Sequence, residues 1–280
     1  MNERFFPADQ FARKFTEEVL LAADIYKRML DSGFEEYAYA VLDAYFISGQ
    51  QEKIKKLGDF FTQYYQAKVT AVAEKGDGWE LTVAFPQFPL NEDNLLCWAI
   101  DLLLKGYEHD CMLDGYGTDA GTGNYEFSDE DNSRLPWYFD EALKAYHHRN
   151  FSAAIIYFSS AIRIFPENPN AWYSRGIARD AIFLRAKALE DYNRAIELAP
   201  SFVEAYINRG VNKNLSASYA AALEDFRKAV DLDGNNATAY FNMGNTHHSM
   251  GNLADACAAW KKAQELGAEY AAEQLALHCK

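Results

Sequence analysis

The second half of the chain repeats one pattern of small and large apolar residues every 34 positions. An alanine is followed four positions later by a large aromatic residue and, three positions after that, by a second alanine. Because residues three and four apart share one face of a helix, the pattern predicts helices whose small residues let a neighbour approach closely. The three columns are Ala154, Ala188, Ala222 and Ala256; Phe158, Tyr192, Phe226 and Trp260; and Ala161, Ala195, Ala229 and Ala263.

An earlier pair of columns predicts a second helix in each repeat. A large aromatic residue is followed four positions later by a small residue, where two helices can cross. We therefore expect antiparallel helix pairs in four units, 135–168, 169–202, 203–236 and 237–270, and a short closing helix within 271–280 that covers the last apolar face. The two columns are Tyr138, Trp172, Tyr206 and Tyr240, then Ala142, Gly176, Gly210 and Gly244.

These columns resemble the tetratricopeptide repeat, which runs aromatic, Gly, Ala, aromatic, Ala and Pro over 34 residues. Pro166 and Pro200 stand at the family's helix-breaking position, and Gly234 and Ala268 replace proline in the last two units. The resemblance implies an all-α superhelix with a concave groove that holds a peptide or protein. Its groove positions here are Phe139, Leu143, Tyr146, Tyr173, Ile177, Asp180, Ile207, Asn208, Val211, Asn214, Phe241, Asn242, Asn245 and His248.

The groove positions are mainly aromatic, aliphatic and amide residues. Members of the family that grip a terminal carboxylate carry Lys and Arg there, so the resemblance does not imply that kind of ligand. Asn208 and Asn242 occupy matching places, and we expect their amides to hydrogen-bond the backbone of an extended ligand. The alternative is that both are ordinary surface residues.

The first half mixes helical and strand patterns. After an opening helix, the order strand, helix, strand, strand, helix, strand is that of the ferredoxin-like βαββαβ sandwich, so we predict an α+β domain. The two middle strands form a hairpin around EKGDG. The predicted helices cover 9–31, about 50–65 and 91–105, and the strands cover 36–48, 68–73, 79–85 and 111–118.

The run FPLNEDNLLCWAIDLLLKGYEHDCMLDGYGT ends in an Asp-Gly-aromatic-Gly-Thr signature. It is similar to regulator of ribonuclease activity B, a family of protein inhibitors of ribonuclease E. The resemblance implies that residues 1–117 bind and inhibit a basic protein such as a ribonuclease. Because Tyr116 is aromatic and flanked by two glycines, we expect it to be the anchor of that interface, and the alternative is that it is a core residue. The family's acidic tail is missing, and the repeat array takes its place. The implied partner-binding residues are Asp114, Gly115, Tyr116, Gly117 and Thr118.

Charge is unevenly divided along the chain. Residues 1–132 carry 11 Lys and Arg against 25 Asp and Glu, a net of −14, whereas 133–280 carry 16 of each. Phosphate contacts need Lys and Arg, so direct nucleic-acid binding by the acidic half is excluded and a basic protein partner is favoured. The alternative is an acidic surface that serves solubility. We place a linker at 118–134, between domains 1–117 and 135–280.

The four cysteines, Cys97, Cys111, Cys257 and Cys279, have wide and irregular spacing. That spacing fits neither a disulfide framework nor a zinc site, so we predict reduced, mostly buried thiols. No apolar run reaches the ~18 residues of a membrane span, and no signal peptide opens the chain. We therefore expect a cytoplasmic protein.

No catalytic constellation emerges from the sequence. DGYGTDAGTG lacks a P-loop lysine and the oxygen spacing of an EF-hand, and the adjacent histidines 147–148 and 247–248 point in different directions. We expect a non-enzymatic interaction protein without metal or cofactor. One alternative is an immunity protein that neutralises a nuclease toxin, and another is a metal-dependent hydrolase that uses Asp114 and Asp119.

Overall fold

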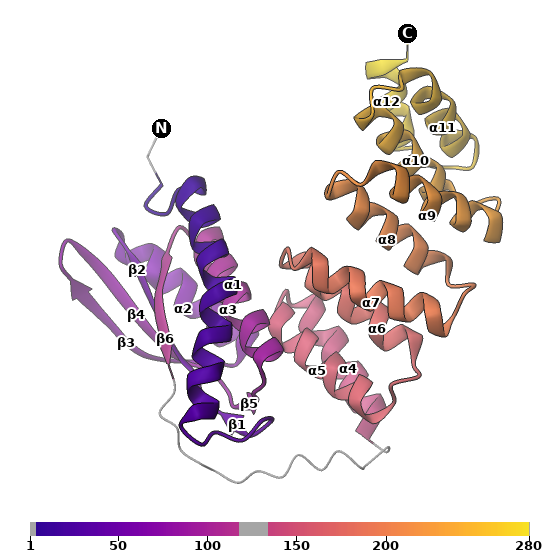
Figure 1. Ribbon diagram of the computed structural model, residues 1–280. Helices are drawn as coiled ribbons and strands as arrows, with labels where there is room; N and C mark the ends of the chain where they lie inside the picture. Colours follow the sequence, from indigo (N-terminus) through magenta and orange to yellow (C-terminus); the bar gives the residue numbers. More distant parts are fainter. Residues whose placement is uncertain (1–3, 118–133, 280) are drawn as a thin grey trace. The chain divides into compact units, whose positions relative to one another are not determined.

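The chain folds into two compact units, Met1–Pro166 and Glu167–Lys280. The computed structural model describes residues 4–117 and 134–279 (Figure 1). The first unit contains an α/β region with two small sheets and the helix pair that follows it, and the described part of the second unit is entirely helical between turns. No helix in these ranges is both long and apolar enough to cross a membrane.

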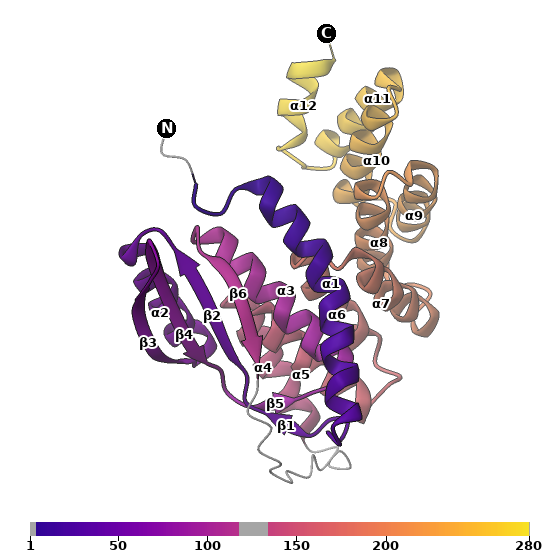
Figure 2. The same cartoon turned by 60° about the vertical axis from the view of Figure 1, so that its left-hand side comes forward.

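The patterns of the first half form their elements in the predicted order. Four strands make an antiparallel sheet in the order β3-β4-β2-β6, against which α2 and α3 pack (Figure 2). The elements are α1 (Ala8–Asp31), β2 (Asp43–Ser48), α2 (Gln51–Tyr65), β3 (Lys68–Lys75), β4 (Gly78–Ala84), α3 (Glu92–Glu108) and β6 (Met112–Gly117).

One predicted strand is divided in two. Residues 36–48 predict a single strand, but β1 (Tyr39–Ala40) pairs with β5 (Phe88–Pro89) in a separate two-stranded sheet. Pro86 follows the end of β4 and cannot donate to a ladder, so residues before β2 pair with the short segment beyond that proline. The single-strand prediction is therefore wrong at its first half.

Helix α3 is the centre of the first unit. Its sequence, EDNLLCWAIDLLLKGYE, is apolar on all sides, and such a helix is stable only where it is buried on all sides. It contacts β6, α1 and α5 (Phe151–Ile164), and Figure 2 shows α1 lying across it. Residues 94–106 are all buried as a result.

A buried carboxylate on α3 holds the start of α5. Asp101 is fully buried, and its Oδ2 accepts the Ser152 N–H at 2.9 Å and the Tyr65 hydroxyl at 2.9 Å. The first N–H groups of a helix lack partners within it and attract negative charge, so Asp101 caps α5 from a neighbouring helix. Burial raises the pKa of Asp101, although Lys105 and the bonds from Ser152 and Tyr65 oppose that rise.

The surrounding charges reinforce this attachment. The fully buried Lys105 ammonium donates to Glu108 at 3.1 Å and lies 5.0 Å from the ring centroid of Phe151, the first residue of α5. Arg149, just before α5, also donates to Glu108, at 2.9 Å. The first turn of α5 is therefore bound to α3 by charge as well as by packing.

The helix pair α4 (Leu135–His147) and α5 consequently belongs to the same compact unit as the α/β region. Our predicted boundary lies at 118–134, of which residues 118–133 are outside the described residues. The division between compact units falls between Pro166 and Glu167, and the domain boundary at 118–134 stays a prediction. The Asp101 and Lys105 contacts give the physical reason for this grouping.

The second unit contains the remaining predicted helix pairs and the closing helix. Each pair matches its 34-residue unit. The helices are α6 (Pro169–Ala181), α7 (Arg185–Leu198), α8 (Val203–Leu215), α9 (Tyr219–Leu232), α10 (Ala237–Ser249), α11 (Leu253–Glu265) and α12 (Ala271–His278).

Glycine sets the close approach within each of these pairs. A Cβ atom at Gly176 would lie 2.7 Å from the Tyr192 ring, and one at Gly210 would lie 2.6 Å from the Phe226 ring. A Cβ atom on Gly244 would lie 2.4 Å from the Trp260 ring. These separations are too short for any side chain, so the predicted crossing of small and aromatic columns is confirmed.

The cysteine prediction is wrong for one pair. Cys257 on α11 and Cys279 after α12 form a disulfide, with Cα atoms 5.7 Å apart. Helix α12 turns the chain back onto α11, a proximity that linear spacing does not reveal. Cys97 and Cys111 are buried and lie outside the disulfide, as predicted, and burial raises the pKa of Cys111 to about 12.

We expect Asp101→Ala to destabilise the first unit by about 3–5 kcal/mol, because the buried Ser152 N–H and Tyr65 hydroxyl lose their acceptor and the buried Lys105 loses a nearby opposite charge. Urea unfolding with hydrogen exchange on α3 and α5 measures this loss. Asp101→Asn is the matched control, since an amide oxygen can still accept. A loss as large in Asn as in Ala would show that hydrogen bonding does not explain the effect.

The Asp101 carboxyl group also makes the stability of the first unit depend on pH in a defined direction. The pKa of Asp101 is raised by folding, so the folded state binds its proton more tightly and this contribution to stability is lost as pH rises through the folded pKa. Wild type should therefore gain stability relative to Asp101→Asn as pH falls from about 7 toward about 4. The opposite trend would contradict the assigned direction.

Trp260→Ala should lower the free energy of unfolding of the second unit by about 3–5 kcal/mol, because Trp260 is 1% exposed and fills the space over Gly244. Leu215→Ala, at a residue 60% exposed, is the control. Urea titration of both variants gives the comparison. A Trp260→Ala loss below about 1 kcal/mol would mean that α10 and α11 are held by other contacts.

Candidate functional site

Equivalent positions on the first helices of successive pairs meet in the second unit. The Asn208 side chain on α8 donates to the Tyr173 hydroxyl on α6 at 3.0 Å. Tyr173 also packs on Phe202, with ring centroids 4.7 Å apart. Ile177 and Val211 are half-buried on the same two helices. The first helices therefore present a continuous row of amide, phenol and aliphatic groups.

Asp180 contributes a half-buried acceptor near this row. Its carboxylate accepts the Tyr192 hydroxyl at 2.8 Å and the Asn212 amide at 2.7 Å. Burial raises the pKa of Asp180, with both hydrogen bonds acting in the opposite direction. Asp180 thus joins α6, α7 and α8, and its two partners occupy it. Asp180 therefore has a structural role, and its role as a groove residue stays a prediction.

The predicted groove residues of the last pair are largely engaged by their own neighbours. Asn245 accepts the Trp260 indole N–H at 2.9 Å, and the Asn242 amide donates to the Thr238 carbonyl at 3.0 Å. The Phe241 ring lies 4.7 Å from that of Tyr270, and the exposed His248 ring lies 5.6 Å from that of Trp260. These four residues therefore already have partners on α10, on α11 and in the turn before α12.

The other predicted groove residues differ in exposure. Ile207 is buried, and Asn214 is half-buried with its side-chain oxygen buried and without a hydrogen-bond partner. The remaining three, Phe139, Leu143 and Tyr146, lie on α4 in the first unit.

Two buried ion clusters in the second unit were not predicted. Asp191 binds Arg175 and Arg179, each at 2.7 Å. One repeat later, Asp225 binds Arg209 at 2.6 Å and Lys213 at 2.8 Å. The signal was present in the sequence, because basic residues and aspartate recur at a shift of 34 in these two units only. These four basic side chains are therefore ion-paired with aspartates of the same unit.

The implied partner-binding segment lies on β6. Asp114 is ion-paired with Lys75 at 2.9 Å, and Tyr116 is half-buried. The Tyr116 hydroxyl donates to Glu18 on α1, and its ring lies 5.4 Å from Trp98 in an edge-to-face contact. Burial raises the pKa of Tyr116, as does the Glu18 carboxylate. These contacts give Tyr116 a packing role.

The metal-dependent alternative gains no support here. Asp114 has a lysine partner, whereas Thr118 and Asp119 are outside the described residues. Across 4–117 and 134–279, no three His, Cys, Asp or Glu side chains are grouped to hold a metal ion. Gly115 and Gly117 continue β6, which pairs with β2.

An aromatic cavity in the first unit also escaped prediction. It has a volume of about 360 Å³ and lies between the α/β region and the α4–α5 pair. Tyr39, Tyr64 and Trp98 line one side, and Trp137, Tyr138 and Tyr157 line the other. Burial raises the pKa of Tyr39 to about 12. The sequence gives no sign of it, because its walls come from five separate segments.

Family profiles match the end of the array. One described as "TPR repeat" matches residues 218–251, and one described as "Tetratricopeptide repeat" matches residues 237–268. Tetratricopeptide repeats are present in the C-terminal region. The helix pairs and their Gly-aromatic crossings show the same arrangement from Pro169 onward.

Several solved structures are similar to the tetratricopeptide repeat region. YrrB, titled a TPR protein with an unusual peptide-binding site, is 22% identical over 64% of this chain and 80% of that chain, with a TM-score of 0.46. A MamA protein is 24% identical over 48% and 73%, with a TM-score of 0.45. The first TPR of Spaghetti (RPAP3), bound to an HSP90 peptide, is 21% identical over 44% and 98%, with a TM-score of 0.42. No curated protein matches the chain.

Proposed function

We propose that this chain is a non-catalytic interaction protein whose tetratricopeptide repeats hold an extended peptide segment along α6 and α8. The observation that carries the proposal is the contact between Asn208 and Tyr173, 35 residues apart in sequence. This contact brings equivalent faces of α6 and α8, the first helices of two successive pairs, into one surface. An extended peptide has unpaired backbone groups at regular intervals, and amide and phenol groups can bind them.

The charges of the second unit favour an uncharged stretch of peptide. Arg175 and Arg179 are bound to Asp191, and Arg209 and Lys213 are bound to Asp225. A terminal carboxylate would have to compete with these buried aspartates for its cations. Ile177 and Val211 add apolar contact area beside the amides. We therefore propose internal peptide segments with apolar side chains as ligands.

Selection from a displayed library of random 12-residue peptides against the full chain tests this proposal. The best selected peptide should lose about tenfold in affinity in Asn208→Ala, which is the size of one hydrogen bond, as measured by calorimetry. Val211→Glu should weaken binding further, by placing an unpaired charge against apolar side chains.

Asn235→Ala is the matched control, because Asn235 is exposed in the turn before α10. Peptides that bind with unchanged affinity to both Asn208→Ala and Val211→Glu use another surface. A selected set dominated by C-terminal carboxylates would contradict the proposed ligand class.

We further propose that the α/β region is a ferredoxin-like domain that binds a basic protein. The strand order β3-β4-β2-β6, with a helix after β2 and another after β4, supports that fold. Lys53 and Lys75 are paired with Asp110 and Asp114, so the region's cations are partly neutralised while its acidic excess remains. Two specific forms of this proposal are that the domain inhibits a ribonuclease, or that it is an immunity protein that neutralises a nuclease toxin.

Association kinetics with a partner purified from host extract test the acidic surface. The on-rate should fall at least about tenfold between about 50 and 200 mM salt, with a smaller change in off-rate, because charge complementarity mainly speeds encounter. Tyr116→Ala should lower the melting temperature, because Tyr116 packs on Trp98.

Tyr116→Phe is the control for that variant, since it keeps the ring and removes the hydroxyl. If Tyr116→Ala weakens binding about 30-fold with unchanged melting, the residue is an interface anchor instead. An on-rate that ignores salt would contradict the electrostatic proposal.

A further inference from the structure

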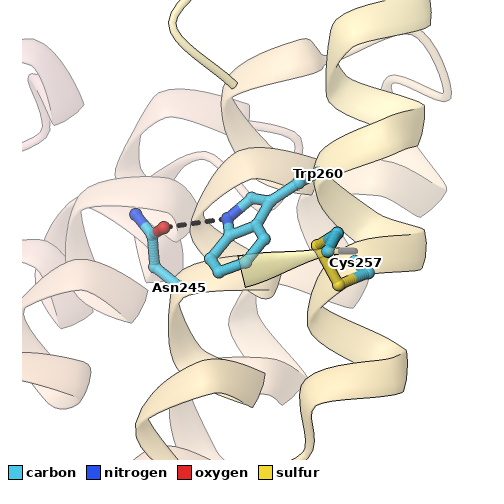
Figure 3. Close-up of a disulfide and its surroundings, with 4 residues drawn as sticks. Asn245, Cys257 and Trp260 are labelled. Carbon is cyan, nitrogen blue, oxygen red and sulfur yellow. Dashed lines mark hydrogen bonds between the residues drawn. A yellow bond between two sulfur atoms is a disulfide. The ribbon is translucent and has the colours of Figure 1, made fainter. Parts of the chain in front are cut away.

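Helix α12 is held on the second unit by one covalent bond and little buried side chain. Of its eight residues only Ala271 is buried, and Leu277 is 61% exposed. Isolated helices shorter than about 12 residues are marginal in water. The disulfide between Cys257 and Cys279 links the end of this short helix to α11 across 22 residues of sequence (Figure 3).

The surface beneath α12 is apolar and fits a helix. Ala256, Trp260 and Ala263 form it from α11, and they are 0%, 1% and 0% exposed with α12 in place. Ala271, Leu275 and Cys279 pack against this cluster. Their spacing of four residues puts them on one face of a helix, so the occupant contacts α11 through a single narrow stripe.

The same segment covers polar and aromatic groups of α10. The His278 ring lies 4.4 Å from that of His248 and 5.8 Å from that of Trp260. The Tyr270 ring, just before α12, lies 4.7 Å from that of Phe241. Helix α12 and its preceding turn therefore contact side chains of α10 as well as those of α11.

We propose that the end of the array, formed by α10 and α11, is a helix-docking surface whose occupancy by α12 is controlled by the Cys257–Cys279 disulfide. In the oxidised chain α12 is the occupant. In the reduced chain the eight-residue helix is held by packing alone, and the surface opens to an amphipathic partner helix with apolar residues at i, i+4 and i+8. The peptide row on α6 and α8 is not part of this surface.

The chemical step is thiol–disulfide exchange with a dithiol. One dithiol thiolate attacks Cys257 or Cys279, the S–S bond breaks, and a mixed disulfide forms with release of the other cysteine as a thiolate. The second dithiol sulfur then displaces the bound cysteine. The protein gains two electrons and, after proton uptake, two thiols, while the dithiol becomes a cyclic disulfide.

Hydrogen exchange on the full chain, with and without dithiothreitol, tests the switch. Reduction should lower the protection of the 271–278 amides at least about tenfold and leave α6 and α7 unchanged. The double variant Cys257→Ser with Cys279→Ser should show the reduced pattern under both conditions. Far-UV circular dichroism verifies that the other helices remain folded. The same protection of 271–278 in oxidised and reduced chains would overturn the proposal.

A peptide of residues 269–280 carrying Cys279→Ser tests the docking surface itself. At about 1 mM, which is comparable to the effective concentration of a segment on a short linker, it should raise the protection of the α10 and α11 amides in the reduced chain. It should have no effect on the oxidised chain. Failure to protect the reduced surface, or equal protection in both states, would overturn the assignment of a redox-controlled surface.

Discussion

The helix pairs of the second unit depend on the absence of a side chain. At Gly176, Gly210 and Gly244 the ring from the second helix of the pair occupies the space where a Cβ would be. This contact fixes how closely each pair packs, and repeating it every 34 residues repeats the pair geometry. The meeting of Tyr173 and Asn208 across two pairs follows from that regularity.

The first unit is organised in another way, by charged side chains buried in its interior. Helix α3 is apolar enough to be buried on every side, yet it carries Asp101 and Lys105 with no exposed surface. Both contact the start of α5: Asp101 accepts the Ser152 N–H, and the Lys105 ammonium lies beside the Phe151 ring. A purely apolar contact would tolerate sliding between these helices, whereas a carboxylate aimed at one N–H fixes the position of α5 along α3.

Sequence patterns predicted the parts of the fold that local periodicity determines. The repeat columns gave every helix of the array because each column is also a packing rule. The split of 36–48 and the pairing of Cys257 with Cys279 depend on which distant segment lies alongside, and periodicity does not contain that information. For the candidate site, the sequence placed Tyr173 and Asn208 at equivalent groove positions, and the two side chains are hydrogen-bonded, while their role in binding stays a prediction. It could not show that Asn245 and Phe241 are already engaged by neighbours.

The buried aspartates of the two middle repeats have a consequence for folding. Similar repeats can stack in the wrong order, since their apolar columns are interchangeable. Asp191 and Asp225 remove part of that freedom, because each finds its cations on the first helix of its own pair. Arg209 also reaches Asn193 of the preceding pair, at 2.8 Å. A chain that paired α7 or α9 with α10 would bury an aspartate opposite Met243, so charge disfavours α10 as a partner for either helix.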